Sequence, residues 1–142
     1  HGLVITALVA GLPKSPVVSD FLGKLMLALI EENFINAEFA TREHSQHSHT
    51  NKRKVRMWIT LSTLVEYLGD DCPQLEAINQ KAWSALQIKN HKNIRKLIQS
   101  FMLKFLRQQP RFLTLGLFPL LDDTNLQYQV AASVVIIASR IL

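Results

Sequence analysis

Apolar residues recur at helical spacing along most of this chain, most clearly between Asn90 and Arg107. In that stretch the apolar positions fall at i, i+3, i+4, i+7, i+8 and i+11, which form one face of an α-helix. Two more leucines lie outside this face, so the helix is expected to pack on two sides. The face consists of Ile94, Leu97, Ile98, Phe101, Met102 and Phe105, and the two additional leucines are Leu103 and Leu106.

The same period predicts further helices, separated by Gly, Pro and Asn positions. Pro16 suits the first turn of a helix, and Gly69 suits the position just after a helix end. Gly116 and Pro119 interrupt an apolar stretch, which therefore predicts only short helical turns. The expected helices cover residues 3–10, 16–33, 55–68, 73–88, 90–107 and 125–142, with short turns over 111–121.

Polar residues mark the expected helix starts. Asp70 and Asp71 precede Cys72 and Pro73, and carboxylates are favoured near the amino end of a helix. Thr124 or Asn125 is expected to cap the last helix. Along the last helix, Val134, Val135 and Ile137 are among the residues expected to point inward. Trp58, Ile59 and Trp83 occupy apolar faces and are expected in the core.

No stretch alternates apolar and polar residues with hairpin turns, so the sequence predicts an all-α fold. Residues 55–59 match residues 94–98 at an offset of 39, and residues 125–130 resemble residues 93–98 at an offset of 32. Helix pairs that recur at such offsets are typical of HEAT-like or armadillo-like solenoids. A plain helical bundle would give similar helices without the repeat. We predict an α-solenoid segment of a longer protein, with a helical pair over 1–40 and helical repeats over 55–142.

Residues 41–54 (TREHSQHSHTNKRK) have a different composition. They include no aliphatic residue and end in a basic cluster, so a polar loop is expected. His44, His47 and His49 could ligate zinc or nickel. Nothing nearby supplies a fourth ligand, and a polar loop is not a preorganised tetrahedral site. We therefore predict a loop and no metal site.

Charge is distributed unevenly along the 142 residues, whose net charge is +5. Between Ala77 and Leu121 the chain has eight Lys or Arg and no Asp or Glu. Such a segment suits nucleic acid, anionic lipid or an acidic protein. No apolar run reaches the roughly 18–20 residues that span a bilayer, so no membrane partner is predicted. The single cysteine excludes an intramolecular disulfide, and we expect an intracellular protein, cytoplasmic or nuclear.

Two basic clusters are the candidate RNA-binding residues. If the repeats stack, the offset of 39 residues places Arg56 and Arg95 in equivalent positions, so the clusters would lie on neighbouring edges of one surface. RNA phosphates could be neutralised there without base readout. The alternative is that these cations belong to solvated helix faces and helix ends and have no role in RNA binding. The clusters are Lys52, Arg53, Lys54 and Arg56, and Lys89, Lys92, Arg95 and Lys96.

Catalytic motifs are missing from these residues. There is no G-x-S-x-G, P-loop, G-x-G-x-x-G or H-E-x-x-H. The pairs Asp70–Asp71 and Asp122–Asp123 lie where helices are expected to start, which favours capping over acid–base catalysis. Cys72 adjoins two acids, which would raise its pKa, so it is not expected to be a nucleophile. No catalytic, cofactor-binding or metal-ligating residue is predicted.

Three runs resemble one enzyme family. These are KVRMWITL at residues 54–61, NIRKLI at 93–98 and LRQQPRFL at 106–113. They resemble the large eukaryotic tRNA (guanosine 2′-O-)methyltransferases, the TAR-RNA-binding-protein-like enzymes related to the SpoU/TrmH group. Those enzymes have, before the catalytic domain, an R-x-W helix, an asparagine-led apolar helix and a phenylalanine–proline-type ending. The resemblance covers Lys54 to Leu142; Gln109-Pro110 fits that ending only loosely, and nothing before Lys54 has a counterpart.

The resemblance implies a long α-solenoid followed by a knotted SPOUT domain. That domain would use S-adenosylmethionine to methylate a guanosine 2′-hydroxyl in the tRNA D-loop. Its cofactor-loop motifs are not among these residues, so the segment itself would be non-catalytic and would hold tRNA or brace the enzyme. The alternative is a HEAT-like scaffold for protein partners with no RNA role; a self-contained enzyme is least favoured.

Overall fold

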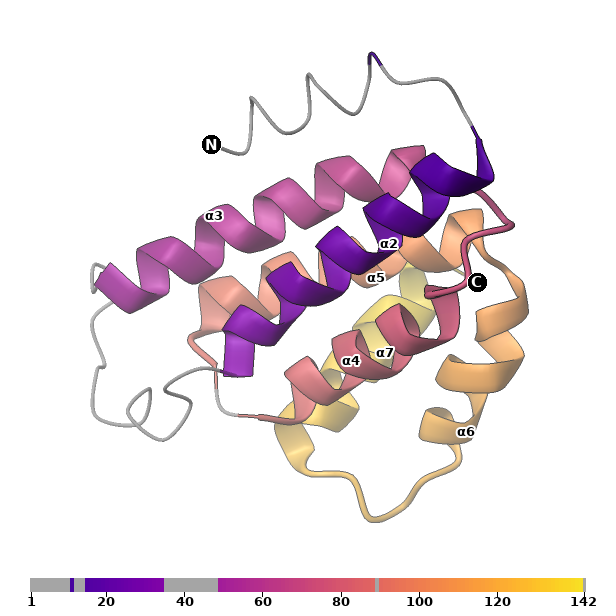
Figure 1. Ribbon diagram of the computed structural model, residues 1–142. Helices are drawn as coiled ribbons and strands as arrows, with labels where there is room; N and C mark the ends of the chain where they lie inside the picture. The colour runs from indigo at the N-terminus through magenta and orange to yellow at the C-terminus, as the bar shows by residue number, and fades with distance from the viewer. Residues whose placement is uncertain (1–10, 12–14, 35–48, 89, 142) are drawn as a thin grey trace.

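Every regular element among the described residues is a helix, which confirms the predicted all-α class (Figure 1). A computed structural model describes Gly11 and residues 15–34, 49–88 and 90–141. The predicted first helix at residues 3–10 lies outside these ranges. The elements are α2 (Pro16–Glu31), η1 (Glu32–Phe34), α3 (His49–Leu64), η3 (Val65–Tyr67), α4 (Leu75–Gln87), α5 (Lys92–Gln108), η4 (Leu113–Leu117, a π-helical segment), α6 (Phe118–Leu121) and α7 (Tyr128–Ile141).

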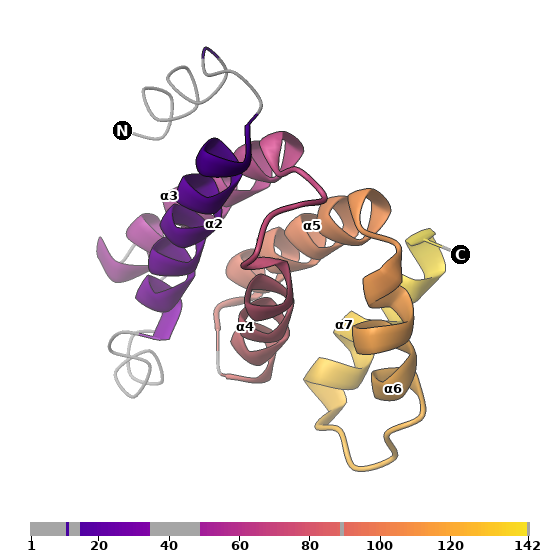
Figure 2. The same ribbon diagram turned by 45° about the vertical axis from the view of Figure 1, so that its right-hand side comes forward.

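The helices form three successive pairs that follow one another in a row: α2 with α3, α4 with α5, and α6 with α7 (Figure 2). Within the first pair, Trp58 near the middle of α3 donates to Asn33 just after α2. Side-chain contacts also join each pair to the next. Asp20 accepts from Gln74 at the start of α4, and Glu31 forms an ion pair with Lys81 farther along α4. Helices α2 and α4 therefore run side by side in the same direction.

Helices α3, α5 and α7 form a second set of parallel neighbours. Lys104 of α5 donates to the Ser62 carbonyl of α3, at a sequence separation of 42. Gln99 of α5 donates to Ser133 of α7, and Arg107 donates to the Arg140 carbonyl, at separations of 34 and 33. Trp58 and then Ser62 of α3 contact Phe101 and then Lys104 of α5, so α3 and α5 are parallel. Ser133 and then Arg140 of α7 contact Gln99 and then Arg107 of α5, so α7 is parallel to α5 as well. They lie behind α2 and α4 in the view of Figure 1.

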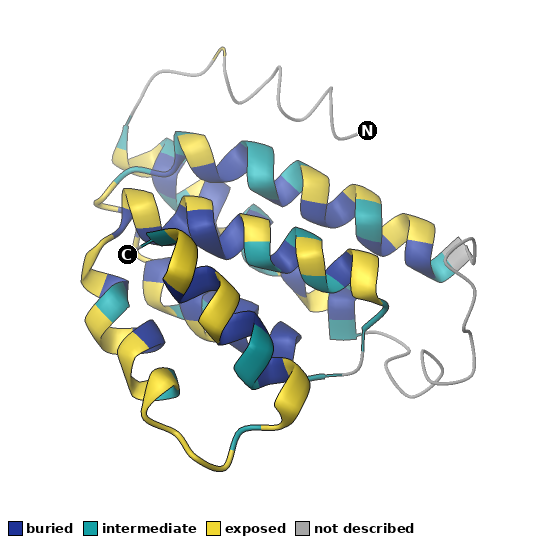
Figure 3. Cartoon of the chain, turned by 180° about the vertical axis from the view of Figure 1, so that it is seen from behind, coloured by how far each residue is buried: buried dark blue, intermediate teal, exposed yellow. Residues whose placement is uncertain are grey.

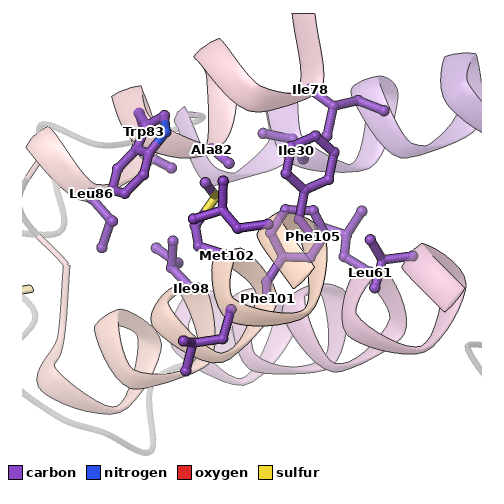
Figure 4. Packing of buried hydrophobic residues seen from close by; sticks show 14 of the residues in the cluster. Ile30, Leu61, Ile78, Ala82, Trp83, Leu86, Ile98, Phe101, Met102 and Phe105 are labelled. Atoms are coloured by element: carbon purple, nitrogen blue, oxygen red, sulfur yellow. The ribbon is translucent and has the colours of Figure 1, made fainter. Parts of the chain in front are cut away.

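Helix α5 is at the centre of the hydrophobic core, as its two-sided apolar pattern predicts (Figure 4). Phe101 meets the Trp58 ring edge-on at 5.5 Å between centroids, and it stacks on Phe105 at 6.1 Å. Phe105 in turn contacts Phe112 at 5.4 Å. Such pairs add about 0.5–1.5 kcal/mol each beyond their buried area. The core residues around α5 in Figure 4 include Ile30, Leu61, Ile78, Ala82, Trp83 and Leu86.

Both tryptophans are buried, as predicted, and each indole N–H has a side-chain acceptor. Trp58 donates to Asn33 at 3.0 Å, and Trp83 donates to Asn79 one turn earlier on α4 at 3.1 Å. The backbone of Gly116 lies against these last two side chains so closely that an added Cβ would come within 2.8 Å of the Trp83 nitrogen. Glycine is therefore required where η4 crosses α4.

The predicted polar loop at residues 41–54 is wrong at its carboxyl end. Residues 49–54 are the first turns of α3, so only residues up to 48 remain outside the described part of the chain, with His44 and His47 among them. The polar composition predicted a loop here, because the contacts that stabilise the start of α3 come from other parts of the chain. Arg53 makes two hydrogen bonds of 3.1 Å to Glu32, while Asn51 and Lys54 are buried.

Two predicted helix starts are also wrong. Helix α4 begins at Leu75, and Gln74 at its cap position makes no capping bond. Asp70 and Asp71 instead link helices, since Asp71 accepts from Ser19 and Asp70 accepts from Gln109. Helix α7 begins three residues beyond Asn125, whose backbone N–H is bound by the carboxylate of Asp123.

Two residues that were predicted to point inward are exposed. Ile59 and Val135 were expected inward, yet they are 51% and 59% exposed, and Val17 and Phe21 on α2 are exposed as well. A single-helix pattern cannot tell which flank of an apolar face has a neighbouring helix. The core is consequently narrower than the periodicity indicated.

Replacing Asn33 tests the link between the first two helices. The change Asn33→Ala leaves the buried Trp58 N–H without an acceptor and should lower the free energy of unfolding by about 1–3 kcal/mol. Urea denaturation followed by tryptophan fluorescence measures this. Asn125→Ala, at an exposed position, is the matched control and should change stability by under about 0.5 kcal/mol. Equal stabilities for the two variants would contradict the assignment.

Candidate nucleic-acid interface

Charge divides between the two sets of parallel helices. Helices α3, α5 and α7 carry four, five and one Lys or Arg, respectively, and no Asp or Glu. Helices α2 and α4 form the other layer, and their acidic residues are Asp20, Glu31 and Glu76. One layer is therefore exclusively basic along its helices, and a polyanion is the complementary ligand for such a layer.

The middle of this layer is a line of cations on α5. Lys92, Lys96, Lys104 and Arg107 are all exposed, and Ser100 occupies the intervening turn. Residues three or four apart lie on the same side of a helix, so these side chains form one stripe. From Lys92 to Arg107 the stripe extends about 22 Å at 1.5 Å per residue.

The neighbouring helices extend the stripe into a surface, which we call the cation face. It comprises the exposed residues Lys52, Arg56, Lys92, Lys96, Lys104, Arg107 and Arg140. Figure 3 views the molecule from the side of α3, α5 and α7, whose outward-facing residues are exposed. Glu66 of η3 is the acid paired with this face, at 3.4 Å from the Lys104 ammonium.

The structure places the eight sequence-predicted residues in different environments. Lys52, Arg56, Lys92 and Lys96 are exposed, as RNA contact requires. Arg53 is exposed, but its guanidinium donates two hydrogen bonds to the Glu32 carboxylate, and these bonds raise the pKa of the guanidinium. Arg95 is half-buried, and its Nε has no hydrogen-bond partner in the described part of the structure; Lys54 is buried. Lys89 lies outside the described residues.

Lys54 is set apart by its burial. Only 3% of the residue is exposed, and burial lowers the pKa of its ammonium. Among the described residues, no carboxylate lies within ion-pair distance of it. Its position one turn before Trp58 on the inner side of α3 explains this, because residues four apart share a helix face. We therefore leave Lys54 out of the cation face.

Three members of the cation face were not identified from the sequence: Lys104, Arg107 and Arg140. They lie far along the chain from the two clusters and reach the same surface because the three helices are parallel. The spacing of four residues from Lys92 through Lys96 and Ser100 to Lys104 could have revealed the α5 stripe. Arg140 belongs to the cation face only because α7 packs beside α5, and the sequence did not indicate this packing directly.

Other chemistry is not assembled in the described residues. No group of three His, Cys, Asp or Glu side chains is placed to hold a metal ion there. Burial raises the pKa of the Cys72 thiol, and the carboxylates of Asp20 and Asp71 add to the effect. The direction agrees with the sequence prediction and makes a reactive thiolate unfavourable. Within the same residues, no helix is long and apolar enough to cross a membrane.

Comparison with known proteins assigns no family. No protein-family model, curated protein or solved structure matches this chain. The cation face is therefore interpreted from its own geometry.

Lys54 should destabilise the folded chain at neutral pH, because a buried ammonium loses hydration. Lys54→Met is expected to raise the free energy of unfolding by on the order of 1 kcal/mol at pH 7. Burial lowers the pKa in the folded state, so above this pKa the unfolded state binds more protons and the stability of the native sequence rises with pH. The difference in free energy of unfolding between Lys54→Met and the native sequence should therefore shrink towards pH 10. Urea denaturation at pH 7, 9 and 10 measures this; Lys52→Met, at an exposed position, should show no such trend.

Proposed function

We propose that this chain is a non-catalytic helical module that binds the phosphate backbone of a folded RNA through its cation face. The observation that carries the proposal is the absence of acidic residues from α3, α5 and α7, which together bear ten Lys or Arg. A surface of fixed cations releases counterions from RNA on binding, which provides affinity without sequence readout.

The side chains of the face favour backbone contact over stacking on bases. Single-strand binders stack successive bases on exposed aromatic rings. On α3, α5 and α7 the one strongly exposed aromatic side chain is Tyr128, at the start of α7. Lysine and arginine side chains on rigid helices instead suit phosphates at fixed positions, as in a folded RNA with double-helical segments.

We further propose that the helix pairs are HEAT-like repeats and that tRNA is the RNA. The parallel packing of α3, α5 and α7 at separations of 42, 34 and 33 residues supports a repeat, since the sequence matches have offsets of 39 and 32. The resemblance to tRNA 2′-O-methyltransferases supports tRNA. In this proposal S-adenosylmethionine belongs to a catalytic domain of the parent enzyme, and none of the described residues is assigned to it.

Neutralising two lysines of the α5 stripe tests the proposal. Lys92→Gln with Lys96→Gln should weaken binding of a tRNA transcript on the order of tenfold at about 0.1 M salt, and should reduce the slope of log affinity against log salt by about 2. Fluorescence anisotropy over a range of salt concentrations measures both quantities.

The matched control removes the same charge from the opposite layer. Lys24→Gln with Lys81→Gln changes net charge equally, and both lysines are paired with carboxylates of α2. Its tRNA affinity should stay near that of the unmodified chain. Equal losses in both double variants would show that net charge alone drives binding. No tRNA binding by the unmodified chain at low salt would leave the alternative of a protein–protein scaffold.

Glu66 offers a change in the opposite direction. It pairs with Lys104 beside the stripe, so Glu66→Gln frees a cation and removes a charge that repels phosphate. Binding of the tRNA transcript should become about two- to fivefold tighter. Glu76→Gln on α4 removes one exposed carboxylate from the other layer and should have a smaller effect. Weaker binding by the Glu66 variant would contradict the proposed position of the RNA.

A further inference from the structure

An uncharged band divides the cation face into two parts. Each of the three helices that form the face has a run without charged residues. Two contacts show that these runs lie at one level, because the rings of Trp58 and Phe101 meet and Gln99 donates to Ser133. The runs are residues 57–64 of α3, 97–103 of α5 and 128–139 of α7.

Three exposed side chains lie along this band, one from each helix. Ile59 of α3 follows Arg56 by three residues, and Ile136 of α7 precedes Arg140 by four, so each isoleucine shares a helix side with a cation of the face. Ile59 is 51% exposed and Ile136 is 37% exposed. Ser100 occupies the intervening turn of the α5 stripe and is exposed as well.

The cations on either side of the band form two rows. The first row lies over the amino-terminal parts of α3 and α5, and the second lies over the carboxyl-terminal parts of α5 and α7. On α5 the band is bordered by Lys96 and Lys104, whose Cα atoms are about 12 Å apart along the helix. Among the described residues, Glu66 is the one acid within ion-pair distance of either row. The first row is Lys52, Arg56, Lys92 and Lys96, and the second row is Lys104, Arg107 and Arg140.

The hydroxyl of Ser100 is an available polar group within the band. Thr60 and Thr63 of α3 and Ser133 of α7 donate to backbone carbonyls one turn earlier in their own helices. The Ser100 hydroxyl has no hydrogen-bond partner among the described residues. Because a hydroxyl can both donate and accept, Ser100 can bind a polar group of a ligand that lies across the band.

Two rows of cations with an uncharged band between them suit the two strands that border a groove of a nucleic-acid duplex. Since α5 has α3 and α7 beside it, α5 cannot enter a deep groove alone. The major groove of B-DNA is about 8.5 Å deep, and that of A-form RNA is deep and narrow, so Ser100 would reach neither floor. The minor groove of B-DNA is only about 6 Å wide, half the separation of the rows. The A-form minor groove is wide and shallow, and it displays 2′-hydroxyls.

We propose that the cation face binds across the minor groove of double-helical RNA. Each row of cations contacts the phosphates of one strand, and the Ser100 hydroxyl binds a ribose 2′-hydroxyl between them. The 2′-hydroxyl both donates and accepts, and it distinguishes RNA from DNA. This inference rests on the proposed binding of RNA and identifies a duplex segment as the part of the RNA that is bound.

Three probes of one sequence test the groove: an RNA duplex of about 16 base pairs, the corresponding DNA duplex and the single-stranded RNA. Fluorescence anisotropy at about 0.1 M salt should show the RNA duplex binding at least about tenfold more tightly than either of the others. Equal binding of the RNA and DNA duplexes, or tighter binding of the single strand, would overturn this inference even if tRNA binds. If neither the RNA duplex nor the tRNA transcript binds, the proposed function fails together with this inference.

Neutralising the second row tests the contact with two strands. Lys104→Gln with Arg107→Gln removes two charges from this row, as Lys92→Gln with Lys96→Gln does from the first. The two double variants should lose affinity for the RNA duplex comparably, each on the order of tenfold. Unchanged affinity in the second-row variant would overturn the two-strand contact and leave RNA binding by the first row intact.

Replacing Ser100 tests contact with the 2′-hydroxyl. Ser100→Ala should weaken binding of the RNA duplex about three- to fivefold and leave binding of the DNA duplex unchanged, because DNA lacks this hydroxyl. The control Ser84→Ala removes an exposed hydroxyl from α4 on the other layer and should change neither affinity. An unchanged RNA affinity in Ser100→Ala, or an equal loss for RNA and DNA, would overturn the role of this hydroxyl.

Discussion

The contact between Trp58 of α3 and Phe101 of α5 is the interaction on which the remaining arrangement depends. It joins the two helices near their middles, and the Trp58 N–H bond to Asn33 attaches η1, which follows α2. Phe101 passes the packing on to Phe105 and Phe112, where the chain turns towards η4. Helix α5 is thereby enclosed by α3, α4 and α7. One side of it remains open to solvent, and that side bears the lysines.

The burial of α5 therefore also determines where its charged side chains lie. A helix with neighbours on most sides can expose only a narrow stripe, and Lys92, Lys96, Lys104 and Arg107 occupy it. Parallel packing brings the exposed cations of α3 and α7 to the same surface. Acidic residues are placed on the other layer or in connections between helices. The result is a surface charge that no single segment of the sequence displays.

Periodicity predicted the helical elements well where apolar residues recur over several turns, as in α2, α4 and α5. It failed where tertiary contacts decide the outcome. The start of α3 looked like part of a polar loop, because the stabilising partner of Arg53 is Glu32, in a different element. Asp70 and Asp71 looked like capping residues, yet they bind side chains beyond their own segment: Asp70 binds Gln109 just after α5, and Asp71 binds Ser19 of α2.

The candidate interface was predicted in part, for a related reason. Local clustering found Lys52 and Lys92 but could not distinguish an exposed lysine from Lys54, since Lys52 and Lys54 have similar neighbours in sequence. The orientation of Lys54 depends on which side of α3 meets the core. Arg140 joins the surface only because α7 packs parallel to α5 at a separation of 33 residues.

Lysine footprinting tests the central claim most directly. The chain is acetylated with and without a tRNA transcript, and mass spectrometry compares the reactivity of each lysine. The account predicts that tRNA protects Lys52, Lys92 and Lys96, while Lys24 and Lys81 on the opposite layer react equally in both conditions. Protection of Lys24 and Lys81, or no protection of the α5 lysines by saturating tRNA, would contradict it.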